Sequence, residues 1–256
     1  MPASKPCVLV TREDPAALAE AIAIAGGQPI QLALLATRWL GFRLPARTTL
    51  DDYDWVAFTS VRSVEAIVRE SEQRGWSWPP ESRCAAVGDR TAHELQALGW
   101  MPDCVAEDGT ARGLLACLAA HGVLGARVFL PCSTIADPAL AEGLTQAGAR
   151  VEVLHVYTTV PAWADAPETM PFLARDLKGA LEQGCVVTVA SPSAVRALMD
   201  LAAAAGALDA LRRTPVAALG PTTAAAARAV GLYCQEAEGR SLACLARKAV
   251  EMGSQA

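Results

Sequence analysis

Two copies of a short glycine-containing phrase are the residues best placed to bind a ligand. One copy runs Val87-Gly88-Asp89-Arg90-Thr91-Ala92, and the other runs Leu219-Gly220-Pro221-Thr222-Thr223-Ala224. Each copy reads as an apolar strand, a glycine turn, a hydroxyl side chain and the start of a helix. The unpaired backbone N–H groups at such a junction can hold an anion or a carbonyl group. We therefore expect Gly88, Thr91, Gly220 and Thr223 to present similar edges to one ligand.

A second pair of matching segments carries serines in front of predicted helices. Phe58-Thr59-Ser60 corresponds to Val189-Ala190-Ser191, which is followed by Pro192-Ser193. An N-cap serine binds the backbone of its own helix, so a purely structural role stays open for Ser60 and Ser191. Because these segments recur in the same order as the glycine phrases, we interpret the chain as two diverged copies of an α/β unit of about 125 residues.

Several other kinds of catalytic site have no motif in this chain. No GxGxxG follows the first predicted strand and no GxxxxGK[ST] occurs, which argues against dinucleotide and P-loop sites. His93, His121 and His155 are isolated and the eight cysteines include no CxxC pair, so we expect no metal. We interpret the cysteines as small, unpaired, buried side chains of a reducing compartment. No serine lies in GxSxG. Hydroxyl groups and backbone donors remain as the binding chemistry.

Composition limits the class of protein and of partner. The chain has 256 residues, of which 52% are apolar and 19% charged, enough apolar material for two cores. The net charge is −5 and no basic stripe occurs, which argues against nucleic acid as a partner. The N-terminus lacks a signal-peptide pattern, and no apolar run approaches the length of a membrane span. We expect a cytoplasmic protein with no membrane partner.

Short apolar strands alternate with helices, a pattern that favours an α/β fold with parallel sheets covered on both faces. In such folds a ligand binds beyond the carboxyl ends of the strands, so the residues that directly follow strands are the candidate site. Strands are expected at 7–10, 29–35, 55–58, 84–87, 128–130 and 151–157, and helices at 61–69, 91–98, 114–120, 139–147 and 241–250.

An ordered set of motifs resembles the uroporphyrinogen-III synthase family. The resemblance extends over nearly the whole chain, and each motif alone would be weak. The motifs are Thr11-Arg12 after the first strand, Phe58-Thr59-Ser60, the two glycine phrases, Val156-Tyr157, and Ser191-Pro192-Ser193-Ala194-Val195.

This resemblance implies an arrangement that repetition alone leaves open, because plain tandem halves fit the repeat equally well. The implied fold has two similar flavodoxin-like parallel-sheet lobes, joined by a two-stranded connector, with a cleft between them. One lobe would comprise residues 1–35 and 167–256, the other residues 47–155, and the connectors residues 36–46 and 156–166.

The implied reaction closes linear hydroxymethylbilane into uroporphyrinogen III. Loss of the ring A hydroxyl gives an azafulvene, ring D attacks to form a spiro intermediate, and fragmentation and reclosure invert ring D. The resemblance implies no cofactor and no metal. We expect a monomer, with hydroxymethylbilane synthase as a candidate transient partner.

The resemblance also assigns roles to residues of this chain. Tyr157 would assist departure of the hydroxyl as a hydrogen-bond donor or acid. The remaining residues would bind substrate: the glycine turns with Gly88, Thr91, Gly220 and Thr223, the serines Ser60, Ser191 and Ser193, and Arg12 as a carboxylate contact.

Three departures from the family pattern leave a second interpretation open. Pro131-Cys132 stands where the family often has Arg-Gly, Glu13 where proline is common, and Val189-Ala190 where Phe-Thr is typical. A two-lobed tetrapyrrole-binding or regulatory protein without catalysis is therefore the alternative. A flavodoxin-like enzyme that uses a nucleotide or flavin is a third reading.

Overall fold

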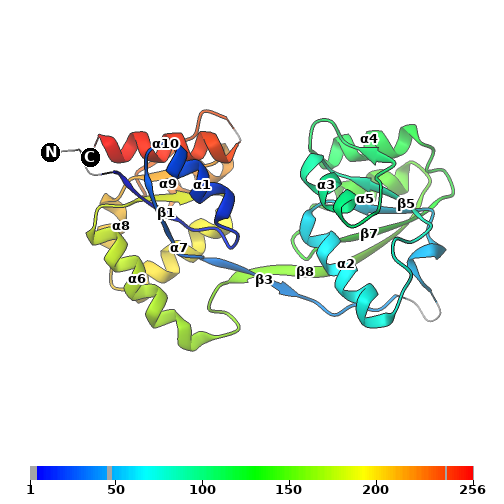
Figure 1. The fold of residues 1–256 in the computed structure, drawn as a ribbon, viewed down its shortest axis with the longest axis horizontal. Helices are drawn as coiled ribbons and strands as arrows, with labels where there is room; N and C mark the ends of the chain where they lie inside the picture. The colour runs from blue at the N-terminus through cyan, green and yellow to red at the C-terminus, as the bar shows by residue number, and fades with distance from the viewer. Residues whose placement is uncertain (1–4, 45–47, 240, 256) are drawn as a thin grey trace. The chain divides into compact units, whose positions relative to one another are not determined.

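The computed structural model describes residues 5–44, 48–239 and 241–255, and divides into two compact units (Figure 1). Unit 1 comprises Met1–Ala36 and Val160–Ala256, and unit 2 comprises Thr37–Thr159. The boundary expected between residues 46 and 47 falls among residues 45–47, outside the described part of the chain.

Unit 1 is built on a five-stranded parallel sheet with the order β11-β10-β9-β1-β2. Strand β1 pairs with β9, Val8 opposite Val186, so the N-terminal segment shares a sheet with the C-terminal half of the chain. The strands are β1 (Cys7–Val10), β2 (Gln28–Gln31), β9 (Val186–Val189), β10 (Val216–Ala218) and β11 (Cys234–Glu236).

Both faces of this sheet are buried because alternate strand residues point to opposite sides. Leu9, Val187 and Val189 belong to a core with α6, α7, α8 and α9. Val8 and Val10 belong to a second core with α1 and α10. The helices are α1 (Ala16–Ile24), α6 (Met170–Glu182), α7 (Pro192–Ala204), α8 (Leu208–Arg213), α9 (Pro221–Ala229) and α10 (Leu242–Ser254), with the short helix η2 (Pro167–Thr169) before α6.

Unit 2 contains a six-stranded sheet with the order β3-β8-β7-β4-β5-β6, parallel from β8 to β6. On β4, Trp55 and Ala57 join a core with α4 and α5, whereas Val56 and Phe58 join a core with α2 and α3. The strands are β3 (Leu35–Trp39), β4 (Trp55–Phe58), β5 (Arg83–Ala86), β6 (Cys104–Val105), β7 (Arg127–Ser133) and β8 (Arg150–Pro161). The helices are η1 (Leu50–Asp52), α2 (Val61–Arg74), α3 (Asp89–Ala97), α4 (Ala111–Ala120) and α5 (Ala139–Gln146).

The predicted α/β fold with parallel sheets is confirmed, but the strand expected at 29–35 is wrong as a single element. Its first half pairs with β1 as β2, and the chain then changes partner and pairs with β8 as β3. Ala162 N donates to Leu34 O and Leu40 N donates to Val156 O, at 3.0 Å each. The apolar run is continuous in sequence, so hydropathy alone does not reveal the change of partner.

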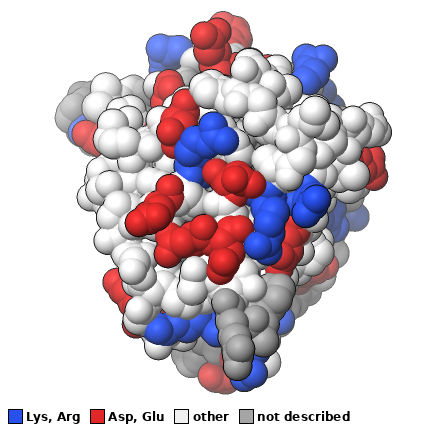
Figure 2. All heavy atoms as spheres, turned by 90° about the vertical axis from the view of Figure 1, so that its right-hand side faces the viewer, with Lys and Arg blue, Asp and Glu red and all other residues white. Residues whose placement is uncertain are grey.

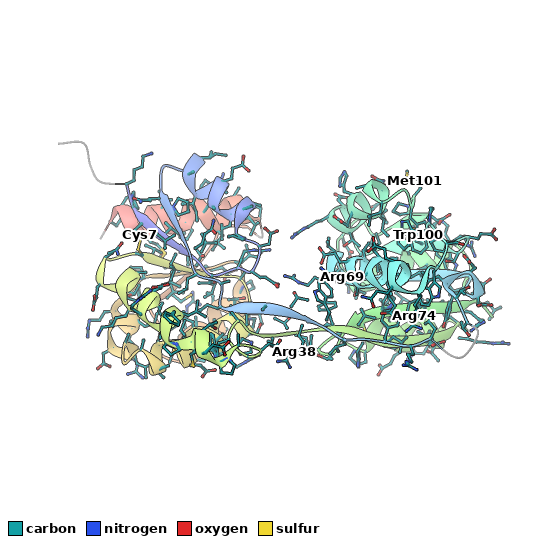
Figure 3. The ribbon with its side chains drawn as sticks, turned by 60° about the horizontal axis from the view of Figure 1, so that its bottom comes forward. Cys7, Arg38, Arg69, Arg74, Trp100 and Met101 are labelled. Atoms are coloured by element: carbon teal, nitrogen blue, oxygen red, sulfur yellow. A yellow bond between two sulfur atoms is a disulfide. The ribbon has the colours of Figure 1, made fainter. Side chains whose placement is uncertain are left out.

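The interpretation of the cysteines as unpaired is also wrong for four of them. Cys7 is joined to Cys185 and Cys104 to Cys117, whereas Cys84, Cys132, Cys234 and Cys244 are free. Cys7 (labelled in Figure 3) and Cys185 directly precede Val8 and Val186, which are opposite each other on β1 and β9. Long-range strand register brings them together, and sequence spacing carries no sign of it.

On the face shown in Figure 2, Lys and Arg side chains are interspersed with Asp and Glu. Within the described residues, none of the helices has both the length and the apolar character needed to cross a membrane.

Candidate functional site

In unit 2, the predicted serine and glycine follow neighbouring strands at the same edge of the sheet. Phe58 is opposite Ala86 where β4 pairs with β5, and Val87 N donates to Phe58 O at 3.0 Å beyond them. Ser60 and Gly88 therefore start α2 and α3 side by side. Both are N-cap residues. Two sets of helix N-terminal N–H groups thus lie at this edge, where the helix dipoles favour negative charge.

Ser60 is hydrogen-bonded to the hydroxyl of Tyr157. Ser60 Oγ accepts from Ser63 N at 3.1 Å, as an N-cap does, and lies 3.0 Å from Tyr157 Oη. Tyr157 comes from β8 and is 9% exposed. The structure therefore joins two predicted site residues in one pair of hydroxyl groups, with a local helix bond that fixes Ser60.

The Tyr157 ring also has an aromatic neighbour. The Trp39 ring of β3 packs against it with a centroid distance of 6.4 Å, and the Arg69 guanidinium lies 4.8 Å from the Trp39 centroid. Arg69 belongs to α2 and is labelled in Figure 3. Cation–π and tilted aromatic contacts of this kind restrict ring rotation, so the direction of the Tyr157 hydroxyl is defined.

Tyr157 also lines a cavity of about 310 Å³ beside the carboxyl-terminal part of β7 and the middle of β8. Val153, His155 and Tyr157 reach it from one face of β8, as the two-residue period of a strand requires. The rest of the lining comes from Thr59, Ala111, Leu130, Cys132, Ser133, Ile135, Ala136, Asp137, Pro138, Leu140 and Ala141.

The cavity offers little positive charge. Cys132 is 2% exposed, and burial raises the pKa of its thiol, so it presents a neutral side chain. Asp137 is an acidic neighbour, and His155 is the basic side chain of the lining. Pro131-Cys132 thus leaves this wall without the arginine that the family pattern often has.

Gly88 and Thr91 stand at the first turn of α3. A Cβ on Gly88 would lie 3.4 Å from Gly109 Cα, so the two turns approach each other closely. Thr91 is 4% exposed, and its N–H bonds Gly88 O at 3.1 Å. The Thr91 side chain is therefore buried, and its N–H is used within the turn.

Unit 1 repeats this edge geometry. Val189 is opposite Ala218 where β9 pairs with β10, and Leu219 N donates to Val189 O at 3.0 Å. Ser191 caps α7, accepts from Ala194 N at 3.2 Å and lies 2.9 Å from Ser193 Oγ. Gly220 starts α9. Arg12, half-buried, follows β1 on the neighbouring strand.

A second cavity, of about 270 Å³, lies over the Gly220 turn. Its lining is Ala190, Leu219, Gly220, Pro221, Thr222 and Thr223. Gly220 has an extended backbone with φ of −163°, and a Cβ there would meet no atom within 4 Å. Neither conformation nor packing demands glycine at this position, which favours close approach of a ligand to the backbone.

The structure therefore groups the predicted residues by unit. Ser60 and Tyr157 are in contact, with Gly88 on the neighbouring strand; Ser191 contacts Ser193, with Gly220 and Arg12 on the strands to either side. Sequence reasoning missed Trp39 and the wall from Ile135 to Pro138. The strand predicted at 128–130 ends short of β7, which runs to Ser133, so the residues that line this wall lay outside the set chosen for following a strand directly.

The expectation of isolated histidines is wrong for His121. Cys104, Cys117 and His121 form the one group with metal-ligand spacing found in the described part of the chain. This group lies on β6 and α4 and shares no residue with either cavity lining.

Most of the chain matches known proteins in sequence. A family model described as uroporphyrinogen-III synthase HemD matches residues 16–244. A protein of Methanothermobacter thermautotrophicus, provisionally named uroporphyrinogen-III synthase, is 34% identical over 178 residues, which cover 68% of each chain.

Two solved structures share the fold. A mutant uroporphyrinogen III synthase of Thermus thermophilus has a TM-score of 0.55 and 20% identity, and the match covers 98% of this chain and 99% of that one. A uroporphyrinogen-III synthetase of Helicobacter pylori has a TM-score of 0.64 and 15% identity, with 97% and 100% covered.

Proposed function

The chain belongs to the uroporphyrinogen-III synthase family, and from this premise we propose that it cyclises hydroxymethylbilane to uroporphyrinogen III with loss of water and inversion of ring D. The observation that carries the proposal is the hydroxyl pair of Tyr157 and Ser60, of which Tyr157 lines the cavity beside β7 and β8. A reaction of this kind needs an oriented proton donor and a shaped site.

Tyr157 is the proposed catalytic residue. Its hydroxyl gives a proton to the departing ring A hydroxyl, the C–O bond breaks, and the oxygen leaves with the electron pair as water. The proton that the free α-carbon of ring D loses on final closure restores the Tyr157 hydroxyl. Ser60 keeps the Tyr157 oxygen in place, and the Trp39 ring restricts its plane. The azafulvene left behind accepts ring D and forms the spiro intermediate, which fragments and recloses.

The substrate's carboxylates are proposed to bind at the helix N-termini. Backbone N–H groups at Gly88 and Gly220, together with the capped starts at Ser60 and Ser191, supply donors at both sheet edges. Arg12 would add a charge-assisted contact and Ser193 a hydroxyl group. Thr91 and Thr223 are 4% and 5% exposed, so their part in binding would be to hold the two turns in place. Much of the rate enhancement would come from folding a flexible chain so that its reacting carbons meet.

We also propose that the two units are diverged copies of one flavodoxin-like lobe. Unit 1 has the order β2-β1-β9-β10-β11, and unit 2 has β8-β7-β4-β5-β6. Numbered along the chain, the strands of unit 1 have the flavodoxin-like order 2-1-3-4-5. Unit 2 has the same order if β7 is counted as its first strand and β8 as its second. The serine and glycine segments then fall at equivalent positions, after the third and fourth strands of each lobe.

The isomer assay tests the proposed reaction. Hydroxymethylbilane closes spontaneously to the type I isomer, so protein is added and the two isomers are separated after oxidation to porphyrins. The proposal expects the type III isomer; production of type I alone would reject it.

A second candidate is a tetrapyrrole-binding or regulatory protein without turnover, and the neutral, buried Cys132 is the observation that favours it. It predicts that the protein binds hydroxymethylbilane, delays spontaneous closure and yields no type III product. If this candidate is right, Tyr157→Phe leaves binding and product composition unchanged. If the protein is a synthase, the same substitution slows turnover.

A further inference from the structure

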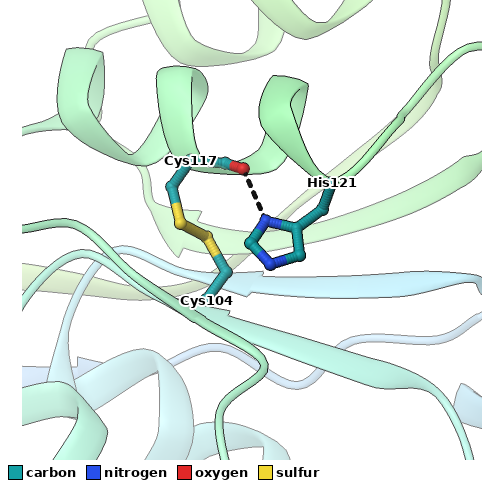
Figure 4. Close-up of side chains that lie close together, drawn as sticks. All are labelled: Cys104, Cys117 and His121. Atoms are coloured by element: carbon teal, nitrogen blue, oxygen red, sulfur yellow. Dashed lines mark hydrogen bonds between the residues drawn. A yellow bond between two sulfur atoms is a disulfide. The ribbon is translucent and has the colours of Figure 1, made fainter.

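Three residues with metal-binding side chains meet on a part of unit 2 that the proposed reaction does not use. Cys104 lies on β6, while Cys117 and His121 come from α4 and its C-cap. One ligand atom of each residue can be chosen so that all lie within 4.8 Å of one another (Figure 4). Two sulfurs and an imidazole nitrogen form a donor set that suits zinc.

Local structure explains why the three residues meet. Cys117 and His121 are four residues apart, so they lie on the same face of the helix. That face covers β6, where Cys104 is 3% exposed within the core below α4 and α5. The Cα atoms of Cys104 and Cys117 are 6.1 Å apart, and the two residues are joined as a disulfide.

The His121 ring is held by a contact within its own helix and by a neighbouring aromatic ring. Its Nδ1 lies 2.9 Å from Cys117 O (dashed line in Figure 4), and a carbonyl oxygen can only accept, so Nδ1 carries the proton. In the neutral imidazole with this tautomer, Nε2 is the nitrogen with the free lone pair. The ring also packs edge-on against Trp55 at a centroid distance of 5.8 Å. A backbone carbonyl that fixes the tautomer is the usual outer contact of a metal-binding histidine.

We propose that Cys104, Cys117 and His121 form a redox-gated zinc site, open when the disulfide is reduced and closed when it is formed. An external thiol reductant supplies two electrons and two protons: its two thiols become a disulfide, and Cys104 and Cys117 become thiols. Zn²⁺ then displaces both thiol protons and takes two thiolates and His121 Nε2, with water as the fourth ligand. In the disulfide form both sulfurs are bonded to each other and cannot serve as thiolates.

The burial of the three residues suits a metal site that opens to the surface. Cys104 is buried, Cys117 is half-buried and His121 is exposed, so the donor set runs from the core to the surface. An ion can enter from the side of His121, while the sulfur ligands stay in apolar surroundings. Either link, the disulfide or the metal, ties β6 to α4.

Cobalt titration of the full chain tests the proposal. The protein is reduced with a phosphine, freed of reductant without oxygen, and titrated with Co²⁺, whose thiolate charge-transfer and tetrahedral d–d bands report the ligands. We expect one Co²⁺ per chain, displaced by one Zn²⁺, with Cys117→Ser and His121→Asn each weakening Zn²⁺ binding at least ~10-fold. The oxidised wild type should show neither band.

Matched controls come from the same chain. His93 Nδ1 lies 2.9 Å from Asp89 O, the same contact as in His121, so His93→Asn should retain full affinity. Cys7→Ser removes a cysteine of the other disulfide, and this variant should also retain full affinity for the metal. Equal binding by oxidised and reduced wild type would overturn the proposal without any variant. So would a reduced protein that binds no Co²⁺, or folded Cys117→Ser and His121→Asn proteins with wild-type affinity.

Discussion

At the scale of the residue, the proposed chemistry depends on one phenolic hydroxyl whose position is fixed from two sides. Ser60 Oγ lies 3.0 Å from it, and Trp39 packs on its ring. The side chain is 9% exposed, so it is screened from bulk water while it borders a cavity. In the proposed reaction, this oriented donor would act on the leaving hydroxyl.

Tyr157→Phe separates the role of the hydroxyl from that of the ring. We expect turnover to fall by about 100-fold or more, since a positioned acid contributes this much, and substrate affinity to change little. The loss of the bond to Ser60 should lower the free energy of unfolding by only ~1 kcal/mol. Steady-state kinetics and urea denaturation measure the two effects, and unchanged turnover in a folded variant would contradict the assignment.

The free cysteines should differ in reactivity in an order set by their surroundings. Ser241 Oγ donates to Cys244 Sγ at 3.1 Å and lowers the pKa of that thiol, with Arg247 adding to the effect. Burial raises the pKa of Cys132 and Cys234, and that of Cys84 to about 12.

The thiolate fraction at neutral pH is therefore largest for Cys244. We expect iodoacetamide to label Cys244 first at pH 7, and the three others slowly, with rates that still rise above pH 9. Peptide mapping over time measures the order. Labelling of Cys132 ahead of Cys244 would show that the cavity wall is more open than the structure has it.

At the scale of the element, the two sheets share one local arrangement. At the end of a strand, a serine or glycine caps the next helix, and pairing of neighbouring strands brings two such helix N-termini together. Ser60 and Ser191 each bind the backbone N–H three residues on. The caps could be predicted from sequence because they are local. The bond from Ser60 to Tyr157 could not, because the partner lies 97 residues away on β8.

Three cap serines make a matched set. Ser60→Ala, Ser191→Ala and Ser241→Ala each remove an N-cap bond, and each should lower the free energy of unfolding by ~1 kcal/mol. Ser60→Ala should also reduce turnover, since it releases the Tyr157 hydroxyl, whereas Ser241→Ala should leave turnover unchanged. Urea melts and initial rates distinguish these effects, and equal activity of all three would place Ser60 outside the site.

Gly220→Ala tests whether the second glycine turn makes room for a ligand. Its extended backbone accepts alanine and no atom lies within 4 Å of the new Cβ, so the free energy of unfolding should stay the same or rise by ~0.5 kcal/mol. We expect KM to rise because the methyl group enters the cavity. Gly231→Ala is the control: φ of +81° disfavours alanine there, so stability should fall while KM stays constant. An unchanged KM for Gly220→Ala would count against the turn as a binding site.

At the scale of the whole molecule, the sequence predicts the alternation of strands and helices, because hydrophobic spacing is a local signal. It does not predict that β1 joins β9, because the order of duplicated segments is the same for tandem and exchanged units. The resemblance to a family supplied that expectation. The cysteine pairs escaped prediction for the same reason, since register between distant strands brings Cys7 to Cys185.

The Cys7–Cys185 link should stabilise unit 1, which is built from two distant parts of the chain. It spans 178 residues and thus restricts a long loop in the unfolded state. We expect Cys7→Ser to lower the stability of unit 1 by about 2–4 kcal/mol under oxidising conditions. Hydrogen exchange should show faster opening of β1 and β9, with β4 and β7 of unit 2 unchanged. Equal protection in both proteins would contradict this account.

The composition of the product formed from hydroxymethylbilane, measured at rising protein concentration, tests the central claim most directly. Spontaneous closure competes at a fixed rate, so a synthase must raise the type III fraction with protein concentration until it dominates. The account predicts this rise. A product that stays type I at every concentration would contradict it.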